Sequence, residues 1–326
     1  MKKVLRIFLC LAFALIAVTG SVFNVYAEED KLYLGGYSAG FSFATRGAYI
    51  IGLCDVISEN GITSPAKSAG LCVGDVILSI DGTNVNNAVD IENTLNNGKE
   101  KTLCIERDNE NMLLEVTPSK DFGGKYKLGV FIRDNINGIG TITYIKNNEF
   151  ASLGHPVISD NNSLLKINGG NLYDCTITGC IKGERGRSGE LKGVFCGNKN
   201  IGNISKNLLT GVYGSLSDDY DYTKLTPIEK GEAKIGEATV YSTVQGTERK
   251  EYKISIVKTD FLNKENKNLV IKINDEQLTS LTGGIVQGMS GSPIVQDGKL
   301  VGAITHVFIN DPQRGFGISI DNMLNN

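Results

Sequence analysis

The most constraining stretch of the sequence is Ser64–Gly82, because it fixes several consecutive pieces of backbone. It reads SPAKSAGLCVGDVILSIDG. A short capped helix that stops at Gly70 is expected first, since glycine is the usual residue just past a helix. Gly74-Asp75 then predicts a tight turn, residues 76–80 a strand, and Asp81-Gly82 a hairpin turn. The chain therefore contains a compact unit of mixed helix and strand.

Within this stretch, the pattern Ala-Gly-Leu-x-x-Gly-Asp-x-Ile-x-x-Ile-Asp-Gly resembles PDZ domains in the strand order of bacterial secreted proteases. Ala88–Leu95 has a helical period, and Lys101–Arg107 with Met112–Thr117 predicts a hairpin. We therefore expect a PDZ domain over residues 31–120, with short strands at Gly40–Phe43 and Ala48–Leu53.

The PDZ resemblance also implies a peptide-binding loop. It assigns this loop to Ser38, Ala39, Gly40 and Phe41, whose N–H groups would hold a peptide C-terminus while the peptide adds a strand to the sheet. The alternative is a PDZ fold that packs against its neighbour and binds nothing.

The remainder of the chain, residues 121–326, consists of short apolar runs separated by Gly, Asn and Asp. The whole sequence holds 39 Gly but only 6 Pro, which indicates tight turns rather than a linker. Such a region predicts a closed barrel or a pair of barrels. The expected fold is mainly β, with a PDZ domain (α+β) followed by a trypsin-like double β-barrel.

A candidate nucleophile lies in Gly288-Met-Ser290-Gly291-Ser292-Pro, between two apolar strands. Gly-x-Ser-Gly-x-Pro is the shape around the nucleophile of trypsin-like proteases. The glycines permit an unusual backbone, and the N–H groups of Gly288 and Ser290 would form the oxyanion hole. Ser292 competes, but Ser290 is preferred because Ser292 occupies the place of a structural glycine. An ordinary glycine turn is the alternative interpretation.

The candidate general base is His155, one of only 2 His in the chain. It is flanked by Gly154 and Pro156, which favours an exposed imidazole, and it precedes Ser290 as in a two-barrel protease. Activity should then rise through an apparent pKa of about 6.5–7. His306 lies in a continuous apolar strand, which favours a buried, structural role.

The third member of the site stays open on spacing alone. Asp275 precedes Ser290 and ends a strand, where Asp is also a turn former. Thr305 follows Ser290, in the strand where trypsin-like folds carry a hydroxyl beside the triad. Either side chain could orient His155.

Several other classes of function are disfavoured. A formal net charge of −3 argues against a nucleic-acid partner. No tight Cys-x-x-Cys pair is present, so no metal is expected, and no organic cofactor is implied. Of the six cysteines after the N-terminal segment, Cys54, Cys72 and Cys104 lie in strand-like runs typical of buried free thiols, and Cys175 and Cys180 could pair. The six are Cys54, Cys72, Cys104, Cys175, Cys180 and Cys196.

The N-terminal segment, residues 1–27, has the pattern of a signal peptide. Basic residues precede the apolar run Ile7–Val18, and Ala27 supplies a small residue before an acidic stretch. We expect an exported protein, with an uncleaved membrane anchor as the alternative.

Taken together, these segments resemble the stage IV sporulation protein B peptidase family. The resemblance is carried by Gly-Ile-Gly-Thr at 138–141, Leu-Gly-His at 153–155, and residues 282–294 followed by 305–312. It implies an exported serine peptidase of endospore formers, acting in the space between the forespore and mother-cell membranes. Such a peptidase cleaves a membrane-bound regulator, which leads to sigma-factor activation, and it also cleaves itself.

By the same resemblance, His155 is the base, Ser290 the nucleophile and Asp275 the acid. Pro156 departs from the family pattern, which usually has an aliphatic residue after the histidine. The competing class is a non-catalytic scaffold, in which the PDZ domain and barrel only bind partners in the forespore envelope.

Overall fold

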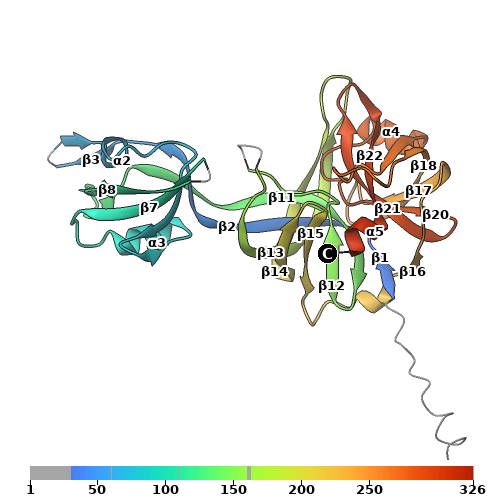
Figure 1. The fold of residues 1–326 in the computed structure, drawn as a ribbon, viewed down its shortest axis with the longest axis horizontal. Helices are drawn as coiled ribbons and strands as arrows, with labels where there is room; N and C mark the ends of the chain where they lie inside the picture. Colours follow the sequence, from blue (N-terminus) through green and yellow to red (C-terminus); the bar gives the residue numbers. More distant parts are fainter. Residues whose placement is uncertain (1–30, 60, 109, 160–162, 326) are drawn as a thin grey trace, which may run out of the picture. The chain divides into compact units, whose positions relative to one another are not determined.

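The computed structural model describes residues 31–59, 61–108, 110–159 and 163–325, and the structural statements below refer to these residues. The expected signal segment lies outside them. The fold is mainly β, with few and short helices (Figure 1). Within the described part of the chain, no helix has both the length and the apolarity needed to cross a bilayer.

The first barrel is a closed ring of paired strands. β2 pairs with β11, and the ring continues through β12, β15, β14 and β13 back to β2. Its strands, with the short β1 that pairs beside β11, are β1 (Leu32–Leu34), β2 (Ser38–Leu53), β11 (Val130–Lys146), β12 (Glu149–Ser152), β13 (Ile167–Ile181), β14 (Glu190–Leu208) and β15 (Gly211–Leu216).

The second barrel closes in the same way. β17 pairs with β18, and the ring runs on through β19, β22, β21 and β20 back to β17. The elements of this half are η1 (Tyr222–Lys224), β16 (Pro227–Lys230), β17 (Gly236–Ser242), β18 (Lys250–Thr259), β19 (Leu269–Ile273), α4 (Glu276–Thr282), β20 (Pro293–Gln296), β21 (Lys299–Phe308), β22 (Asp311–Ser319) and α5 (Ile320–Leu324). Two closed rings confirm the expected double barrel.

The PDZ lobe follows the sequence expectations closely. The predicted helices and hairpins form, and Asn87 caps α3 by accepting from the N–H of Asp90. Its elements are β3 (Val56–Ser58), β4 (Gly61–Thr63), α2 (Pro65–Ser68), β5 (Val76–Ile80), β6 (Thr83–Asn84), α3 (Ala88–Thr94), β7 (Lys101–Arg107), β8 (Glu110–Val116), β9 (Ser119–Lys120) and β10 (Tyr126–Lys127).

The expected domain boundary at residues 31–120 is wrong, because the PDZ lobe is inserted between two strands of the first barrel. β2 is one strand, not two, and it pairs with β11 from Ser38↔Thr141 to Leu53↔Val130. The barrel part of β2 ends near Gly47, whose φ of +86° suits only glycine. Residues 32–45 therefore belong to the barrel, and the chain returns to it along β11.

The proposed PDZ loop at Ser38–Phe41 is also wrong. These residues lie inside β2, where Gly40 pairs with Ile139 on one side and Tyr173 on the other. Both strand edges are occupied, so no peptide can add there. Phe41 is buried in the core of the first barrel, and a Cβ on Gly40 would lie 2.3 Å from the ring of Phe195.

Candidate active site

Ser290 lies on a tight turn that leads into β20 of the second barrel. Gly288 and Gly291 on either side of it have φ values of +96° and +91°. A Cβ on Gly291 would lie 2.1 Å from the backbone oxygen of Thr141. Glycine is therefore required at this position both by the backbone conformation and by the close approach of the first barrel.

Two threonines of β11 hold this turn from the opposite barrel. Thr141 donates its hydroxyl to the oxygen of Gly288 at 2.9 Å, and Thr143 donates its hydroxyl to the oxygen of Gly291 at 2.7 Å. The N–H of Thr141 also donates to the oxygen of Ser290 at 2.9 Å. Sequence reasoning quoted residues 138–141 only as a family mark and missed this role. The available signal was that Thr141 and Thr143 alternate with Ile142 and therefore share one face of a strand.

The backbone of the turn leaves two donors available. Within the described residues, the N–H groups of Gly288 and Ser290 donate to no other backbone oxygen, whereas those of Met289 and Gly291 donate to Val286 and Ile304. These two free N–H groups are the ones expected to stabilise an oxyanion.

Ser290, Gly288, His155, Thr305 and His306 line a single pocket of about 530 Å³, here called the serine pocket. His155 comes from the segment after β12 of the first barrel, and the other four come from the second barrel. The structure thus brings the predicted nucleophile, the predicted base and the predicted oxyanion donors to one pocket, with one candidate catalytic side chain from each barrel.

His155 is half-buried, and its Nδ1 lies 2.9 Å from the oxygen of Pro156. A carbonyl oxygen can only accept, so this contact places the proton on Nδ1 and leaves Nε2 free to accept another. Burial lowers the pKa of His155 below its usual value, and the contact with Pro156 opposes this only in part. The imidazole is therefore neutral at neutral pH, as a general base must be.

The Ser290 hydroxyl donates to the oxygen of Thr305 at 2.8 Å. Among the described hydrogen bonds there is none between Ser290 and His155. A rotation about the Ser290 side-chain bond is needed before His155 can accept the proton.

His306 is a correction to the sequence expectation. Its side chain is exposed rather than buried, and its ring centroid lies 4.7 Å from that of His155. Desolvation, with smaller contributions from the charges of His155 and Lys267, lowers the pKa of His306 to about 4. The two histidine rings are tilted by 40° relative to each other, and both line the pocket that contains Ser290.

The two candidates for the third member lie in different places. Asp275 caps α4: its carboxylate accepts from the N–H of Leu278 at 2.9 Å and from that of Lys253 at 3.2 Å. It does not line the serine pocket. Thr305 does, and its side chain is only 4% exposed, with no partner for Oγ1 within the described structure.

Ser292, the competing nucleophile, is 0% exposed. Its hydroxyl donates to the hydroxyl of Ser242 at 3.0 Å, and both side chains are buried. It does not line the serine pocket, so it cannot reach a substrate carbonyl there.

The PDZ lobe has a groove of its own, of about 260 Å³, here called the PDZ groove. One side is α3, including Ala88 and Ile91, and the other is the segment from Tyr126 to Ile132. Val130 pairs with Leu53 of β2 on one edge only, so the opposite edge of this part of β11 faces the groove. The sequence analysis did not single out the run Leu128-Gly129-Val130, which lines this groove.

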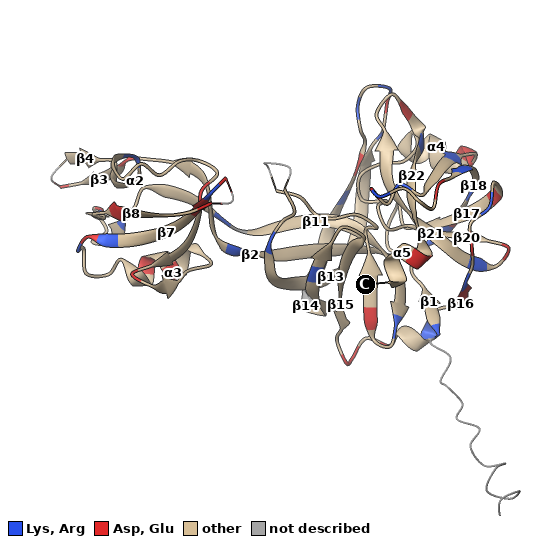
Figure 2. Ribbon diagram, in the orientation of Figure 1, with Lys and Arg blue, Asp and Glu red and all other residues tan. Residues whose placement is uncertain are grey.

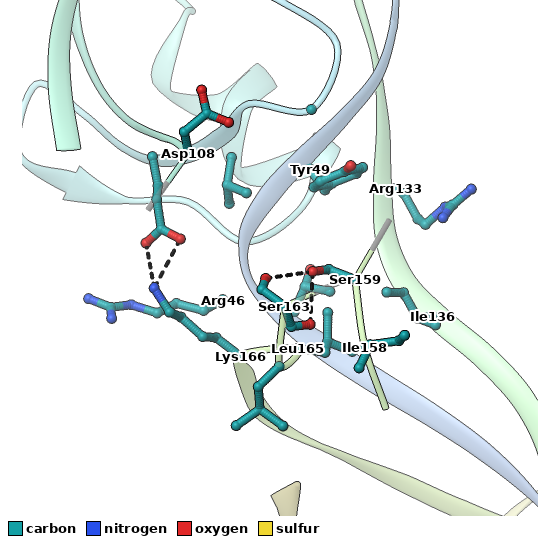
Figure 3. Close-up of a pocket in the computed structure, with 15 residues that line it drawn as sticks. Arg46, Tyr49, Asp108, Arg133, Ile136, Ile158, Ser159, Ser163, Leu165 and Lys166 are labelled. Atoms are coloured by element: carbon teal, nitrogen blue, oxygen red, sulfur yellow. Dashed lines mark hydrogen bonds and ion pairs between the residues drawn. The ribbon is translucent and has the colours of Figure 1, made fainter. Parts of the chain in front are cut away.

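A further pocket, of about 150 Å³, is drawn in Figure 3. It contains Arg46 and Tyr49 of β2 and Lys166, whose amine contacts Glu106 at 3.0 Å. Neither Ser290 nor His155 lines it, so it is separate from the site.

The six cysteines after residue 30 are all free thiols in the structure, including Cys175 and Cys180. Among the described residues, no group of three or more His, Cys, Asp or Glu side chains is arranged to hold a metal ion.

Two family models match the chain. One, described as SpoIVB peptidase S55, covers residues 124–324, and the other, described as a PDZ domain, covers residues 57–107. The second range falls within the inserted lobe.

Individual relatives match shorter parts. A probable chloroplastic membrane metalloprotease, ARASP2, of Arabidopsis thaliana is 37% identical over 81 residues, which cover 22% of this chain and 18% of that protein. Serine protease HTRA1 of Xenopus tropicalis is 38% identical over 77 residues, covering 23% and 15%. The chain thus spans less than a fifth of these relatives. The solved Rv3671c protease from M. tuberculosis, in its active form, is 13% identical, covering 58% of this chain and 72% of that one with a TM-score of 0.34.

Proposed function

The chain belongs to the SpoIVB peptidase family, and on that premise we propose that it is a serine endopeptidase with Ser290 as nucleophile and His155 as general base. The observation that carries the proposal is the serine pocket, which contains both side chains and the two free N–H donors.

The proposed reaction is acyl transfer to Ser290. The Ser290 hydroxyl leaves the oxygen of Thr305, rotates to the free Nε2 of His155 and attacks the substrate carbonyl as the proton moves to His155. The N–H groups of Gly288 and Ser290 stabilise the oxyanion, and each such donor is typically worth a few kcal/mol. His155 then protonates the leaving amine, and water releases the acyl group by the reverse sequence.

We propose Thr305 rather than Asp275 as the group that orients His155 during this reaction. A buried hydroxyl without a partner typically costs about 1–3 kcal/mol, so Thr305 Oγ1 gains from a hydrogen bond. The Thr305 side chain packs against Gly154, the residue before His155, where a Cβ would lie 2.9 Å from the Thr305 methyl group. A small rotation of the ring could therefore exchange the oxygen of Pro156 for Thr305 Oγ1 without displacing the base.

The wider role is also a proposal, supported by membership of the family and by the pattern of residues 1–27. We propose an exported peptidase that acts between the forespore and mother-cell membranes during sporulation. Its substrates are a membrane-associated regulatory protein and its own N-terminal region, and cleavage of the regulator leads to sigma-factor activation. The PDZ groove would recruit a peptide end of the substrate.

A fluorophosphonate probe, which reacts with activated serines, tests the proposed activity. The unaltered chain and Ser292→Ala should both be labelled, although Ser292→Ala should be destabilised by about 1 kcal/mol because Ser242 loses a partner. Ser290→Ala should remain folded, unlabelled and inactive, with kcat lowered on the order of 10⁶-fold. Labelling of folded Ser290→Ala, or a folded but unlabelled unaltered chain, would favour the non-catalytic scaffold or a different nucleophile.

A further inference from the structure

We propose that the peptidase cleaves beside a large apolar side chain, such as Leu or Phe, and rejects Lys, Arg, Asp and Glu at that position. The inference deepens the proposed function and rests on it. It derives from the composition of the serine pocket, in which the nucleophile and the base lie.

No described residue that lines the serine pocket is Asp, Glu, Lys or Arg. Its only ionisable side chains are His155 and His306, and both are neutral at neutral pH. Figure 2 shows that charged residues are instead spread over the PDZ lobe and over strands of both barrels. A charged substrate side chain entering the pocket would lose its water without meeting an opposite charge, which is strongly unfavourable.

The walls of the serine pocket are apolar on both sides. Ile136 and Ile139 of β11 line it from the first barrel and Val307 of β21 from the second, and all three are only partly buried, so they offer apolar surface to a substrate. Removal of an apolar substrate side chain from water against these residues is favourable and scales with its area.

The rim of the serine pocket extends the apolar surface outwards. Ile158 is 51% exposed and Ile309 is 58% exposed, and both line the pocket from opposite barrels. The pocket volume of about 530 Å³ exceeds that of one side chain, so apolar neighbours of the scissile residue are also accommodated. The expected substrate is therefore an apolar stretch of polypeptide that binds in extended form in the serine pocket between the barrels.

The experiment uses the purified full chain and four fluorogenic peptides that differ only in the residue before the scissile bond: Leu, Phe, Arg or Asp. Kcat/KM for the Leu and Phe peptides should exceed that for the Arg and Asp peptides by at least about 100-fold, within the range that a single pocket can discriminate. The same preparation is labelled with the fluorophosphonate probe.

Two variants locate the pocket residues. A carboxylate placed on either side, by Val157→Asp or Ile309→Asp, should raise kcat/KM for the Arg peptide at least about tenfold in one of the two. Ile309 is exposed, so that variant should fold. Val257→Asp, at an exposed aliphatic position on β18 outside the pocket, should leave kcat/KM for the Arg peptide unchanged.

The outcomes separate the two proposals. Labelling of Ser290 together with efficient cleavage of the Arg or Asp peptide overturns the inference and leaves the proposed activity intact. If kcat/KM for the Arg peptide rises in neither Val157→Asp nor Ile309→Asp, the serine pocket is overturned as the determinant of specificity. A folded chain that is neither labelled nor active on any peptide overturns the proposed function itself.

Discussion

At the scale of single residues, the first question is which side chain, Thr305 or Asp275, orients His155. Thr305→Val removes Oγ1 but keeps the shape, and should lower kcat by 10²-fold or more with little change in KM, because the orientation of His155 matters most in the transition state. Thr305→Ser should restore most of the rate. Asp275→Ala should instead lower stability by about 1 kcal/mol through loss of the α4 cap and leave kcat nearly unchanged.

Measured kcat, KM and urea unfolding of these three variants and of Asp275→Asn decide between the candidates. A rate loss near 10⁴-fold in Asp275→Asn, which retains a capping group, would return the role to Asp275. A normal rate in Thr305→Val would remove it from Thr305.

The two histidines predict an unusual dependence on pH. Because the pKa of His155 is lowered, the acid limb of kcat/KM should fall below the usual imidazole value of about 6.5, not at or above it as the sequence suggested. A rate profile with its acid limb at or above pH 6.5, with chemistry limiting, would contradict the burial of His155.

Stability should change with pH in the same direction. The pKa of His306 is about 4 in the folded chain, so between about pH 6.5 and 4 the unfolded chain binds more protons. The contribution of neutral His306 to the stability of the folded chain is therefore fully present above pH 6.5 and is lost as the pH falls towards 4. The melting temperature of the unaltered chain should fall relative to that of His306→Gln as the pH is lowered from about 6.5 towards 4; parallel curves would exclude the effect.

How far a residue's role could be predicted depended on where its partners lie in the sequence. Ser290 and Gly288 were assigned from one local turn, and the structure places them in the pocket. Asp275 and His306 could not be judged locally. A carboxylate after a strand serves equally as a helix cap or a triad member, and an apolar strand hides which of its faces lines a cavity.

At the scale of secondary-structure elements, the PDZ motif shows the strength of local patterns and β2 their limit. The helix and hairpins of residues 65–116 formed as expected because turns and caps are local. The alternation of Ser38–Leu53 predicted strand correctly, but alternation does not name the partner strand. β2 pairs with β13 and with β11, which lie far along the chain. The sequence therefore assigned the first half of β2 to the PDZ domain, although it belongs to the first barrel.

The PDZ groove gives the prediction at this scale. Ala88 of α3 lines the groove and Val89, 64% exposed, does not. Ala88→Trp should fill the groove and lower cleavage of a protein substrate or self-cleavage at least about tenfold, because an extended peptide needs that space. Hydrolysis of a short peptide should be unchanged.

Val89→Trp, on the same helix but facing away from the groove, is the matched control and should leave both reactions unchanged. Equal loss on both substrates in Ala88→Trp would mean that the groove supports the fold. Unchanged cleavage of both substrates would mean that the PDZ groove does not recruit the protein substrate.

At the scale of the whole molecule, the insertion of the PDZ lobe determines which part of the chain can be removed. Ala44 of β2 pairs with Asn135 of β11, and the lobe is built from the residues between them. Replacing residues 46–133 with Asn-Gly would turn these strands into a simple hairpin, since Asn-Gly favours a two-residue turn. Both barrels and the serine pocket would keep all their strands.

Deleting residues 31–120 instead removes β1 and the whole of β2, which opens the first barrel and strips Phe41 from its core. We therefore expect the chain with the Asn-Gly turn to fold, to be labelled by the fluorophosphonate probe and to hydrolyse short peptides. The chain lacking residues 31–120 should be unfolded by circular dichroism and unlabelled. If that larger deletion folds and is labelled while the Asn-Gly chain is not, residues 32–45 do not belong to the barrel, and the ring of strands that positions Thr141 against the nucleophile must close in another way.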